Sequence, residues 1–546
     1  MSKNEVIEDV TSALIKVSDR VMPRILSQIC RDENSPNYGC SDRNWWHYKM
    51  RDFPSIILQQ SGATIHASQC LESYASYSDE LNKLTVASCE FWNKRAVRFR
   101  SFEEYYPWEE GYPPLAFSTL SIVRMVAEGV VAIEYVAPGL KVASKQLLNR
   151  FELQAANQQV AGLAALSWIY KISPDLVSLE EVNTLIDNTL QLQNEEGWFN
   201  EYGGPDLGYL SVTIDCLWDA FDATGDYRLI KSAEKSLDFI DKMTCNSFGE
   251  SIGMHNARNT DYIVPYGISR FLDPNVDQNF QKKSLRLLKN IFCNSDCNKH
   301  FFSSVDDRYW CHYIGLSVVR SVKVLSEIHI DNSIEFESDK KDVNMYFPSS
   351  GYVWKDLNQA QFKVLISMKK GGNFTVFSHF LNCSDFGWVV KSKGECFTSH
   401  WWSNDWKTKI TNDCCIVSGY LFSHVEIKSN PFNHFLLRIS SFFMGRKLIS
   451  FLKNRLIFKK KKNIINFIRI INFNNNSIVV EDKFDQHPVD CIFIRAPRSS
   501  KRHVASADSF HYEDLSLGNC QANEKRVISN NNTIITTTYL LSDWII

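Results

Sequence analysis

The sequence predicts an α+β multidomain protein in which a helical N-terminal half is followed by an antiparallel β half. Residues 1–335 repeat their apolar side chains every three or four positions, which is the period of a helix. Beyond residue 342 apolar and polar side chains alternate, which is the period of a strand. The charged stretch Ile328–Lys341 lies between the two patterns. We therefore assign a helical domain to 1–335 and a β-sandwich domain to 342–546.

In the helical half, apolar periodicity predicts helices at Val126–Val136, Gln158–Tyr170 and Leu229–Met243. A further helix should begin at Ser178, because Ser178 and Glu181 have the spacing of a capping box, and it should end before Gly197. Asp206 precedes the apolar run LSVTIDCLWDAF, so we expect Asp206 to cap that helix.

The β half contains alternating runs such as FKVLISMKKGGNFTVFSHF and SIVVEDKF. Gly371 and Gly372 stand between two alternating runs, which predicts a β-hairpin. Several strands of this kind, each with one face turned inward, are typical of a sandwich.

The composition excludes several classes of protein. The 546 residues are 44% hydrophobic and 22% charged, which excludes disordered, collagen-like and coiled-coil chains. Sixty Lys and Arg residues against 62 Asp and Glu residues leave a net charge of −2, so we expect no nucleic-acid partner. Nucleotide-binding motifs such as GxxxxGKS/T and GxGxxG are absent. Aromatic residues make up 13%, which suits both sugar stacking and a large core.

The cysteines and the first residues predict a cytoplasmic protein. Fifteen scattered cysteines, an odd number, indicate reduced thiols rather than a disulfide framework. The opening MSKNEVIEDVTSALIKVSDR has no basic segment followed by an apolar one, so no secretory signal is expected. No apolar run reaches the ~18–20 residues of a membrane span. Peripheral attachment to the inner membrane stays open.

One cluster has loosely metal-like spacing. Cys293, Cys297 and His300 are compatible with zinc, and Cys311 and His312 follow shortly after them. Buried or loop thiols are the favoured interpretation, because the chain has no clean pair of CxxC elements. We therefore predict no cofactor, and leave open whether a metal binds there.

A basic segment stands apart in the β half. Ser441–Ile470 carries nine Lys and Arg residues and no acidic residue, interleaved with Phe, Leu and Ile. Such a stretch can lie on an anionic membrane, so Arg446–Lys462 is a candidate for peripheral membrane contact. The alternative, slightly favoured, is an insertion in the β domain whose basic side is merely solvated.

Near the N-terminus, cations and aromatic rings alternate. The candidates for binding an acidic sugar are Arg43, Trp46, His47, Lys49 and Arg51. Rings stack on sugar faces while the cations meet carboxylate or sulfate groups. A loop locked by Arg–Asp pairs and buried Trp is an equally good interpretation.

Motifs in both halves resemble the heparinase II/III-like family of polysaccharide lyases. In the β half these are Tyr346–Tyr352 (YFPSSGY), then VLISMKKGGNF, then Asp385–Trp388 (DFGW). In the helical half, Gly197–Tyr209 and Arg258–Gly267 resemble two loops that carry catalytic residues in such lyases. The resemblance implies an incomplete α/α toroid followed by an antiparallel β-sandwich. It also implies cleavage of a uronic-acid polysaccharide by β-elimination.

The second of these loops supplies the main catalytic candidates. In β-elimination the substrate carboxylate is neutralised, a base removes the C5 proton and an acid protonates the departing O4. The resemblance makes Tyr262 the proton-transferring tyrosine, and Tyr266 completes the same Y-x-x-x-Y-G pattern as a substrate-binding residue. Arg258 is the candidate that neutralises the carboxylate or depresses the pKa of Tyr262. A packed aromatic is nearly as good an interpretation of Tyr262.

Residues beside these complete the predicted site. Asn256 and His255 adjoin Arg258, although a hydrogen-bonded loop histidine is the favoured interpretation of His255. Asn200 and Glu201, followed by Tyr209, match the place where family members bind the substrate carboxylate, and the histidine found in several members is absent.

In the β half, His379 lies six residues before Asp385, whereas the family's histidine lies closer, where this chain has Cys383. His379 is a catalytic candidate, and an inward strand residue is its favoured interpretation.

Two other functions are kept beside the lyase. A uronate C5-epimerase would use the same neutralisation and proton removal but return a proton to C5. A non-catalytic glycan-binding or assembly protein in envelope polysaccharide biosynthesis would keep the fold and lose the chemistry, which the departures at Asn200 and Cys383 favour. In each case the partner is an acidic polysaccharide.

Overall fold

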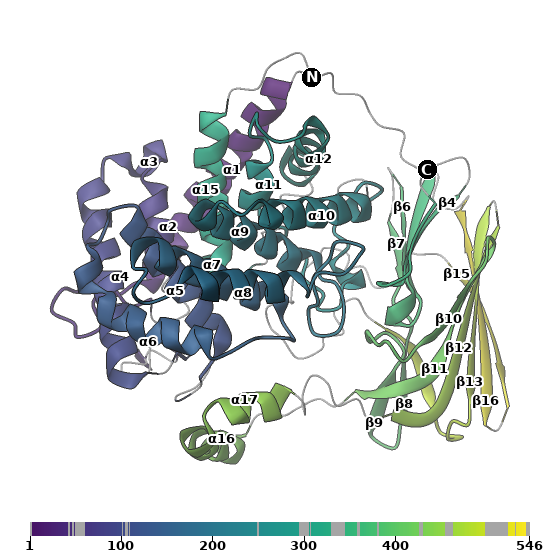
Figure 1. The fold of residues 1–546 in the computed structure, drawn as a ribbon. Coiled ribbons are helices and arrows are strands. Elements are labelled where there is room, and N and C mark those ends of the chain that lie inside the picture. Colours follow the sequence, from purple (N-terminus) through teal and green to yellow (C-terminus); the bar gives the residue numbers. More distant parts are fainter. Residues whose placement is uncertain are drawn as a thin grey trace.

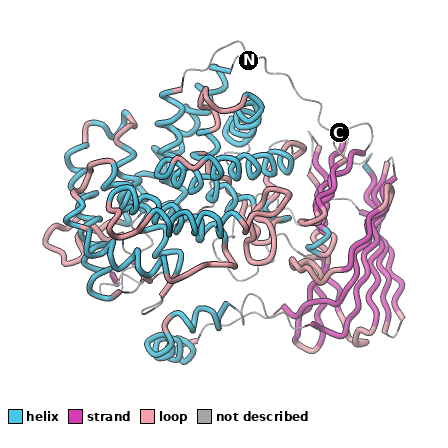
Figure 2. The backbone as a smooth tube through the Cα atoms, in the orientation of Figure 1, coloured by secondary structure: helices cyan, strands magenta, loops and turns pink. Residues whose placement is uncertain are grey.

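A computed structural model describes residues 3–41, 44–45, 48–49, 60–100, 102–103, 108, 110–247, 250–293, 305, 307–328, 344–357, 361–378, 382–424, 430–453, 462–474, 476–496, 522–529 and 531–541. Helices make up the N-terminal part and strands the C-terminal part (Figure 2). The fold class predicted from the sequence is confirmed.

An inner ring of helices forms the centre of the N-terminal domain (Figure 1). Its members are α2 (Gln60–Ser68), α5 (Tyr112–Ala127), α7 (Ala156–Ile172), α9 (Leu207–Thr224), α11 (Tyr266–Arg270) and α15 (Gly315–Glu327). Each of these helices contacts the next member of the ring, and the last member, α15, contacts the first, α2. The ring is therefore closed, which is more complete than the toroid that the family resemblance implies.

A second layer of helices surrounds the ring. Its members are α1 (Lys3–Gln28), α4 (Ser78–Phe99), α6 (Ala137–Leu148), α8 (Leu179–Leu190), α10 (Tyr227–Thr244) and α12 (Gln278–Leu288). Each of them packs on at least one member of the ring. The inner helix α7 is buried on nearly every side, whereas α8 buries only one stripe. An apolar inner layer and amphipathic outer helices are what a double ring requires.

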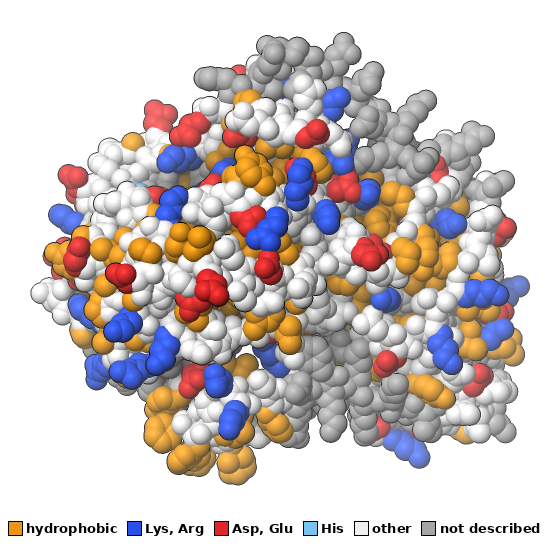
Figure 3. Space-filling model, in the orientation of Figure 1, with side chains coloured by type: hydrophobic (Ala, Val, Ile, Leu, Met, Phe, Trp, Pro, Cys, Tyr) orange, Lys and Arg blue, Asp and Glu red, His pale blue; other side chains and the backbone are white. Residues whose placement is uncertain are grey.

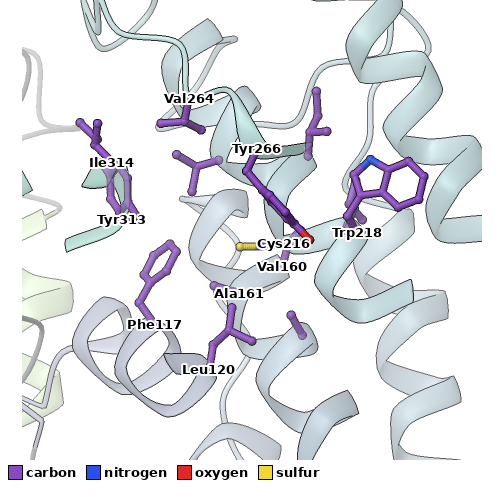
Figure 4. Close-up of a cluster of buried hydrophobic side chains, with 14 of the residues drawn as sticks. Phe117, Leu120, Val160, Ala161, Cys216, Trp218, Val264, Tyr266, Tyr313 and Ile314 are labelled. Atoms are coloured by element: carbon purple, nitrogen blue, oxygen red, sulfur yellow. The ribbon is translucent and has the colours of Figure 1, made fainter. Parts of the chain in front are cut away.

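Short elements complete the helical domain. They are α3 (Glu72–Ala75), η2 (Ile133–Tyr135), η3 (Gly253–His255), η4 (Lys289–Cys293), α14 (Asp307–Tyr309) and η5 (Trp310–Ile314). Figure 4 shows the middle of the ring, where side chains from α5, α7, α9, α11 and η5 meet. Tyr266 and Tyr313 lie in this apolar cluster.

Most of the helical predictions are confirmed. Gln158–Tyr170 lies within α7 and Leu229–Met243 within α10. Ser178 and Glu181 form the expected capping box at α8, and Asp206 caps α9 by accepting a hydrogen bond from the backbone N–H of Tyr209.

The helix predicted at Val126–Val136 is wrong. Helix α5 ends at Ala127, and Gly129 takes a left-handed conformation with φ 74° that a helix cannot continue through. Residues 130–132 lie in a bend and its extension, Ile133–Tyr135 form the 3-10 turn η2, and Val136 caps α6.

The C-terminal domain contains two antiparallel sheets. The five-stranded sheet has the order β3-β4-β5-β6-β7, from strands Met345–Phe347, Tyr352–Leu357, Phe362–Ser367, Asn373–Phe377 and Cys383–Asp385. The nine-stranded sheet has the order β14-β8-β9-β11-β12-β13-β16-β15, with β10 paired to β11. Its strands are β8 (Trp388–Ser392), β9 (Glu395–Thr398), β10 (Lys407–Ile410), β11 (Cys414–His424), β12 (Lys462–Asn474), β13 (Ser477–Asp485), β14 (Ile492–Arg495), β15 (Ala522–Ile528) and β16 (Asn532–Leu540).

The two sheets share an apolar core, which confirms the sandwich. Val364 and Phe374 of the smaller sheet belong to the same buried cluster as Phe467 and Val480 of the larger one. The predicted hairpin also forms: Gly371 and Gly372, both with positive φ, connect η6 (Met368–Lys370) to β6.

A buried ionic network lies inside the sandwich. Asp385, from the DFGW motif, accepts hydrogen bonds from Arg469 at 3.0 Å, Arg495 at 2.8 Å and the Tyr539 hydroxyl at 2.7 Å. Burial alone would raise the pKa of Asp385, but the two arginines hold that pKa below its usual value. In this chain the motif therefore holds the sheets together.

Two helices connect neighbouring strands, and the basic segment begins near the end of the first helix. Along the chain, α16 (Pro431–Met444) and α17 (Arg446–Lys453) follow β11 and precede β12, and these two strands pair with each other. Figure 1 shows the two helices beneath the helical domain, away from the sheets. Within the described ranges, none of the helices has the length and apolar character to cross a membrane.

Other predictions have mixed outcomes. Twelve described cysteines are free, whereas Cys383 is disulfide-bonded, so the expectation of reduced thiols does not hold at Cys383. Cys297, His300 and, apart from Ile328, the predicted linker Ile328–Lys341 lie outside the described residues. Among the residues that are described, no three His, Cys, Asp or Glu side chains gather as a metal site would require.

Candidate functional site

Two loops of the helical domain meet the five-stranded sheet. The first runs from residue 191 to 206 between α8 and α9, and the second from 245 to 265 between α10 and α11. Phe347, Tyr352 and Trp402 of the β domain belong to the same apolar cluster as the helical core. Both family-like loops therefore lie at a packed domain junction.

Glu196 fixes the first loop to the β domain. Its carboxylate accepts hydrogen bonds from the backbone N–H groups of Ser349 at 2.6 Å and Ser350 at 3.0 Å. Nearby, the indole N–H of Trp402 donates to the carbonyl of Gly203 at 3.0 Å.

Lys370 and Tyr352 fix the second loop. The Lys370 ammonium donates to the backbone carbonyls of Met254 at 2.6 Å and Asn256 at 2.7 Å. The Tyr352 hydroxyl donates to the carbonyl of His255 at 3.0 Å. Because these contacts hold main-chain atoms, they set the path of the loop that carries Arg258.

Arg258 is a buried cation that has no counterion partner among the described residues. Its side chain is only 7% exposed, and its guanidinium lies 4.4 Å from the centre of the Tyr202 ring. Among the described residues, no carboxylate forms an ion pair with Arg258, and its Nε has no hydrogen-bond partner. A guanidinium binds carboxylate groups in a planar, two-pronged manner, so Arg258 is suited to an anionic ligand.

Glu201 is a buried carboxyl group that interacts electrostatically with Arg258. One carboxyl oxygen accepts from the backbone N–H of Asn157 at 2.7 Å, and the other has no partner among the described residues. Burial raises the pKa of Glu201 well above its ordinary value, Asp206 adds to this, and Arg258 opposes it. Glu201 is therefore a carboxyl group tuned to bind a proton at higher pH than usual.

The first turn of α7 contains two more buried side-chain oxygens without a hydrogen-bond partner among the described residues. They are Oδ1 of Asn157 and Oε1 of Gln158, whose Nε2 donates to the Tyr202 hydroxyl at 3.4 Å. With Nε of Arg258 and one oxygen of Glu201, they provide one donor and three acceptors. Unsatisfied buried polar groups are rare in native proteins, and a sugar offers the hydroxyls that would satisfy these atoms.

A cluster of tyrosines adjoins this group. The hydroxyls of Tyr262 and Tyr313 lie 2.6 Å apart, which is a short hydrogen bond. The Tyr209 ring meets the Tyr262 ring edge to face at 6.4 Å, and Tyr309 lies 6.1 Å from Tyr313. Burial raises the pKa of Tyr262 and of Tyr313 well above 10. Both hydroxyls therefore keep their protons at neutral pH.

Helix α17 of the β domain reaches the same place. The Lys453 ammonium lies 3.0 Å from a carboxylate oxygen of Glu152 and 5.4 Å from the centre of the Tyr202 ring. Tyr202 thus has a cation from each domain close to its ring, Arg258 and Lys453.

The structure brings four of the predicted residues together, whereas other predicted residues form hydrogen bonds elsewhere in the loops, the domain junction and the ring core. Glu201, Tyr209, Arg258 and Tyr262 belong to one cluster joined by the contacts and electrostatic effects above. The Asn200 side chain instead accepts from the backbone N–H of Gly203 at 3.0 Å within its own loop.

Three further predicted residues have buried contacts of their own. His255 Nε2 lies 2.9 Å from the Thr375 hydroxyl across the domain junction. The Asn256 amide donates to the carbonyl of Thr260 at 3.1 Å. Tyr266 lies in the ring core, where its hydroxyl accepts from Arg270 at 2.8 Å.

Most of the remaining predicted residues lie outside the part of the chain that the structure describes. Outside the described residues lie Arg43, Trp46, His47, Arg51 and His379. Lys49 belongs to β2 (Tyr48–Lys49), which pairs with β1 (Asn44–Trp45), and its side chain is not described. Their proposed roles stay predictions.

Sequence reasoning missed several residues of the site. Tyr202 directly follows the predicted residue Glu201. Its role was missed because its partner Arg258 is 56 positions away along the chain. Tyr313 directly follows Cys311 and His312, which the sequence indicates only as metal-ligand or thiol candidates, and only the fold brings Tyr313 to Tyr262.

No protein-family model and no curated protein sequence matches this chain. Solved structures that resemble it include the chondroitin AC lyase of Streptomyces coelicolor A3 in complex with chondroitin sulphate, at 8% identity over 97% of this chain and 77% of that one, TM-score 0.49. Heparinase III aligns at 10% identity over 97% and 82%, TM-score 0.44. An unsaturated glucuronyl hydrolase specific for heparin aligns at 11% identity over 60% and 100%, TM-score 0.40.

Since every one of these TM-scores is below 0.5, we base the function on the residues of this chain. The helical ring and the antiparallel sandwich are present in the expected order. This chain therefore has the two-domain fold, an α/α toroid followed by a β-sandwich, that its motif resemblance to the heparinase II/III-like lyases predicts.

Proposed function

We propose that this protein is a polysaccharide lyase that cleaves an acidic, uronic-acid-containing glycan by β-elimination. The observation that carries the proposal is Arg258, a cation that is 7% exposed, stacked on Tyr202 and without an ion-pair partner among the described residues. A buried unpaired charge is costly to maintain, and a ligand carboxylate would neutralise it.

In the proposed reaction, Arg258 binds the uronate carboxylate and thereby makes the C5 proton more acidic. A base takes the C5 proton, and the electron pair of that C–H bond forms the C4–C5 double bond. The C4–O4 bond breaks, and the departing O4 receives a proton from an acid. Atoms and charge balance without any redox partner.

The described residues suggest which group plays each part. The Tyr262–Tyr313 hydroxyl pair is protonated at neutral pH, because burial raises the pKa of both, so we assign the pair to protonating O4. Glu201 has one carboxyl oxygen without a partner and a raised pKa, which suits it to receive the C5 proton.

The first experiment incubates the purified protein with a panel of uronate-containing polysaccharides in heavy water. Ultraviolet absorbance detects the unsaturated uronate, and proton NMR detects deuterium at C5. Tyr262→Phe should lower the cleavage rate by about 10²–10⁴-fold, which is the usual contribution of general acid–base catalysis. Tyr539→Phe is the control, because it removes another buried tyrosine hydroxyl, hydrogen-bonded to Asp385 inside the β-sandwich.

The outcomes separate the alternatives. Unsaturated uronate that depends on Tyr262 supports the lyase. Deuterium at C5 without chain cleavage identifies a C5-epimerase with the same carboxylate recognition. Full cleavage by Tyr262→Phe contradicts the assignment of the acid.

A second candidate function is glycan binding without turnover. The observation that favours it is the saturation of the catalytic candidates: Tyr262 bonds Tyr313, and His255 and Asn256 hold the domain junction. A glycan that binds through Arg258 and shows neither cleavage nor deuterium exchange supports this function and rejects the lyase.

A further inference from the structure

Helix α16 presents an apolar face to solvent. The exposed residues, between 42% and 79% accessible, are Phe432, Phe435, Leu436, Ile439, Phe442, Phe443 and Met444. Six of them, all except Met444, recur at the three- and four-residue spacing that puts them on one side of a helix. Figure 3 shows hydrophobic side chains gathered where Figure 1 places this helix. A contiguous patch of this kind marks an interaction surface.

Basic side chains lie beside this face. Helices α16 and α17 contain no acidic residue, and their basic residues are Arg438, Arg446, Lys447 and Lys453. Arg446 and Lys447 at the start of α17 are exposed, and Arg438 lies next to Phe435 and Phe442 on the edge of the apolar face. Long basic side chains beside an apolar face can extend to anionic groups while the face is buried.

The other side of the helix pair is held by the helical domain. Ser441 and Leu448 are buried, and Lys453 forms its ion pair with Glu152. The Phe442 ring also makes an edge contact with the Trp108 ring, with the two ring centres 5.3 Å apart. The pair is therefore anchored, with its apolar face directed outward.

We propose that α16 and α17 form a docking element for an anionic lipid surface, with the apolar face of α16 inserted at the headgroup boundary. Aromatic and aliphatic residues on one face with basic residues beside them are the pattern of an interfacial helix. A second copy of this chain is a poorer occupant, because it would bring two basic surfaces together. The proposal is independent of the catalytic assignment.

The test is flotation of the full-length protein with vesicles of phosphatidylcholine alone or with phosphatidylglycerol added. Wild-type protein should float with the anionic vesicles, and less so at high salt. Arg446→Glu/Lys447→Glu should weaken partitioning by more than tenfold, since each basic residue near an anionic surface contributes about fivefold. Ile439→Glu/Phe443→Glu should abolish flotation.

Matched variants control for folding and for general charge. Tyr227→Glu changes a 72% exposed aromatic residue on the helical domain, and Lys407→Glu/Lys409→Glu changes two exposed cations of β10. Both should float like wild type, and all variants should share its circular dichroism spectrum. Absence of wild-type flotation, or equal flotation with neutral vesicles, overturns the proposal. So does a lipid-independent dimer in light scattering that Ile439→Glu/Phe443→Glu dissociates.

Discussion

Arg258 on the face of Tyr202 is the residue-scale feature that distinguishes this junction. A lysine in its place would keep the charge but lose the planar fork and the stacking on the ring. Lys453 already lies near the same ring and is paired with Glu152, so a further point charge would not replace the guanidinium.

Arg258→Lys should therefore weaken binding of an acidic glycan by about tenfold or more, because bidentate recognition of carboxylate is lost. Isothermal titration of the wild type and the variant with the same glycan gives the two Kd values. Arg228→Lys is the control, since Arg228 is half-exposed and pairs with Asp226 and Asp187 on the surface. Equal affinity of Arg258→Lys and wild type would remove Arg258 from the binding site.

At the scale of elements, the inner ring depends on polar contacts between neighbouring helices. Asp215 of α9 accepts a hydrogen bond at 2.6 Å from the backbone N–H of Gly267 at the start of α11. Burial raises the pKa of Asp215 to about 7. In the unfolded chain an aspartate titrates near 3.9. The contribution of Asp215 to the free energy of unfolding is therefore largest below about pH 4, falls as pH rises towards 7 and is constant above it.

Asp215→Asn removes this titration while keeping a side-chain acceptor. Relative to wild type, the variant should gain stability between pH 5 and pH 8, which urea unfolding at the two pH values measures. Asp187→Asn, at a 56% exposed side chain, should show no such gain. A difference between Asp215→Asn and wild type that does not change with pH would contradict the raised pKa.

At the scale of the whole molecule, the two domains are held together by contacts to the main chain. The carboxylate of Glu196 accepts from the backbone of Ser349 and Ser350 on the other domain. A glutamine at position 196 would turn its NH₂ group towards one of these two backbone N–H groups. Two donors would then face each other, and that N–H group would lose its hydrogen bond.

Glu196→Gln should therefore lower the free energy of unfolding by about 1.5–3 kcal/mol, the range for a hydrogen bond to a charged group. Thermal unfolding measures the loss as a lower Tm. The neighbouring exposed residue provides the control, because Glu195→Gln changes the same charge without touching the junction. Equal Tm values for both variants would show that Glu196 contributes nothing to the junction.

Local signals in the sequence predicted the elements but not the contacts between them. The capping box of Ser178 and Glu181 and the glycine pair at 371–372 are short-range features, and both form as expected. Val126–Val136 failed because one glycine ended the helix inside an apolar run. The order of the two domains followed from the change of period, which is a property of long segments.

The site was predictable only in part for the same reason. Arg258, Tyr262, Glu201 and Tyr209 lie in loops whose motifs are visible in the sequence. The pairing of Tyr262 with Tyr313 and the stacking of Arg258 on Tyr202 join residues more than fifty positions apart. Such contacts depend on ring closure and domain packing, which no local pattern encodes.

The most direct test of the central claim compares each acidic polysaccharide of the panel with its carboxyl-reduced form. Titration into the wild-type protein gives the affinity for both. If Arg258 receives a uronate carboxylate, at least one acidic glycan binds, and its neutral counterpart binds at least about tenfold more weakly. Arg258→Lys should show a similar loss of affinity for the acidic form. Equal affinity for the acidic and reduced forms would contradict carboxylate recognition at this site.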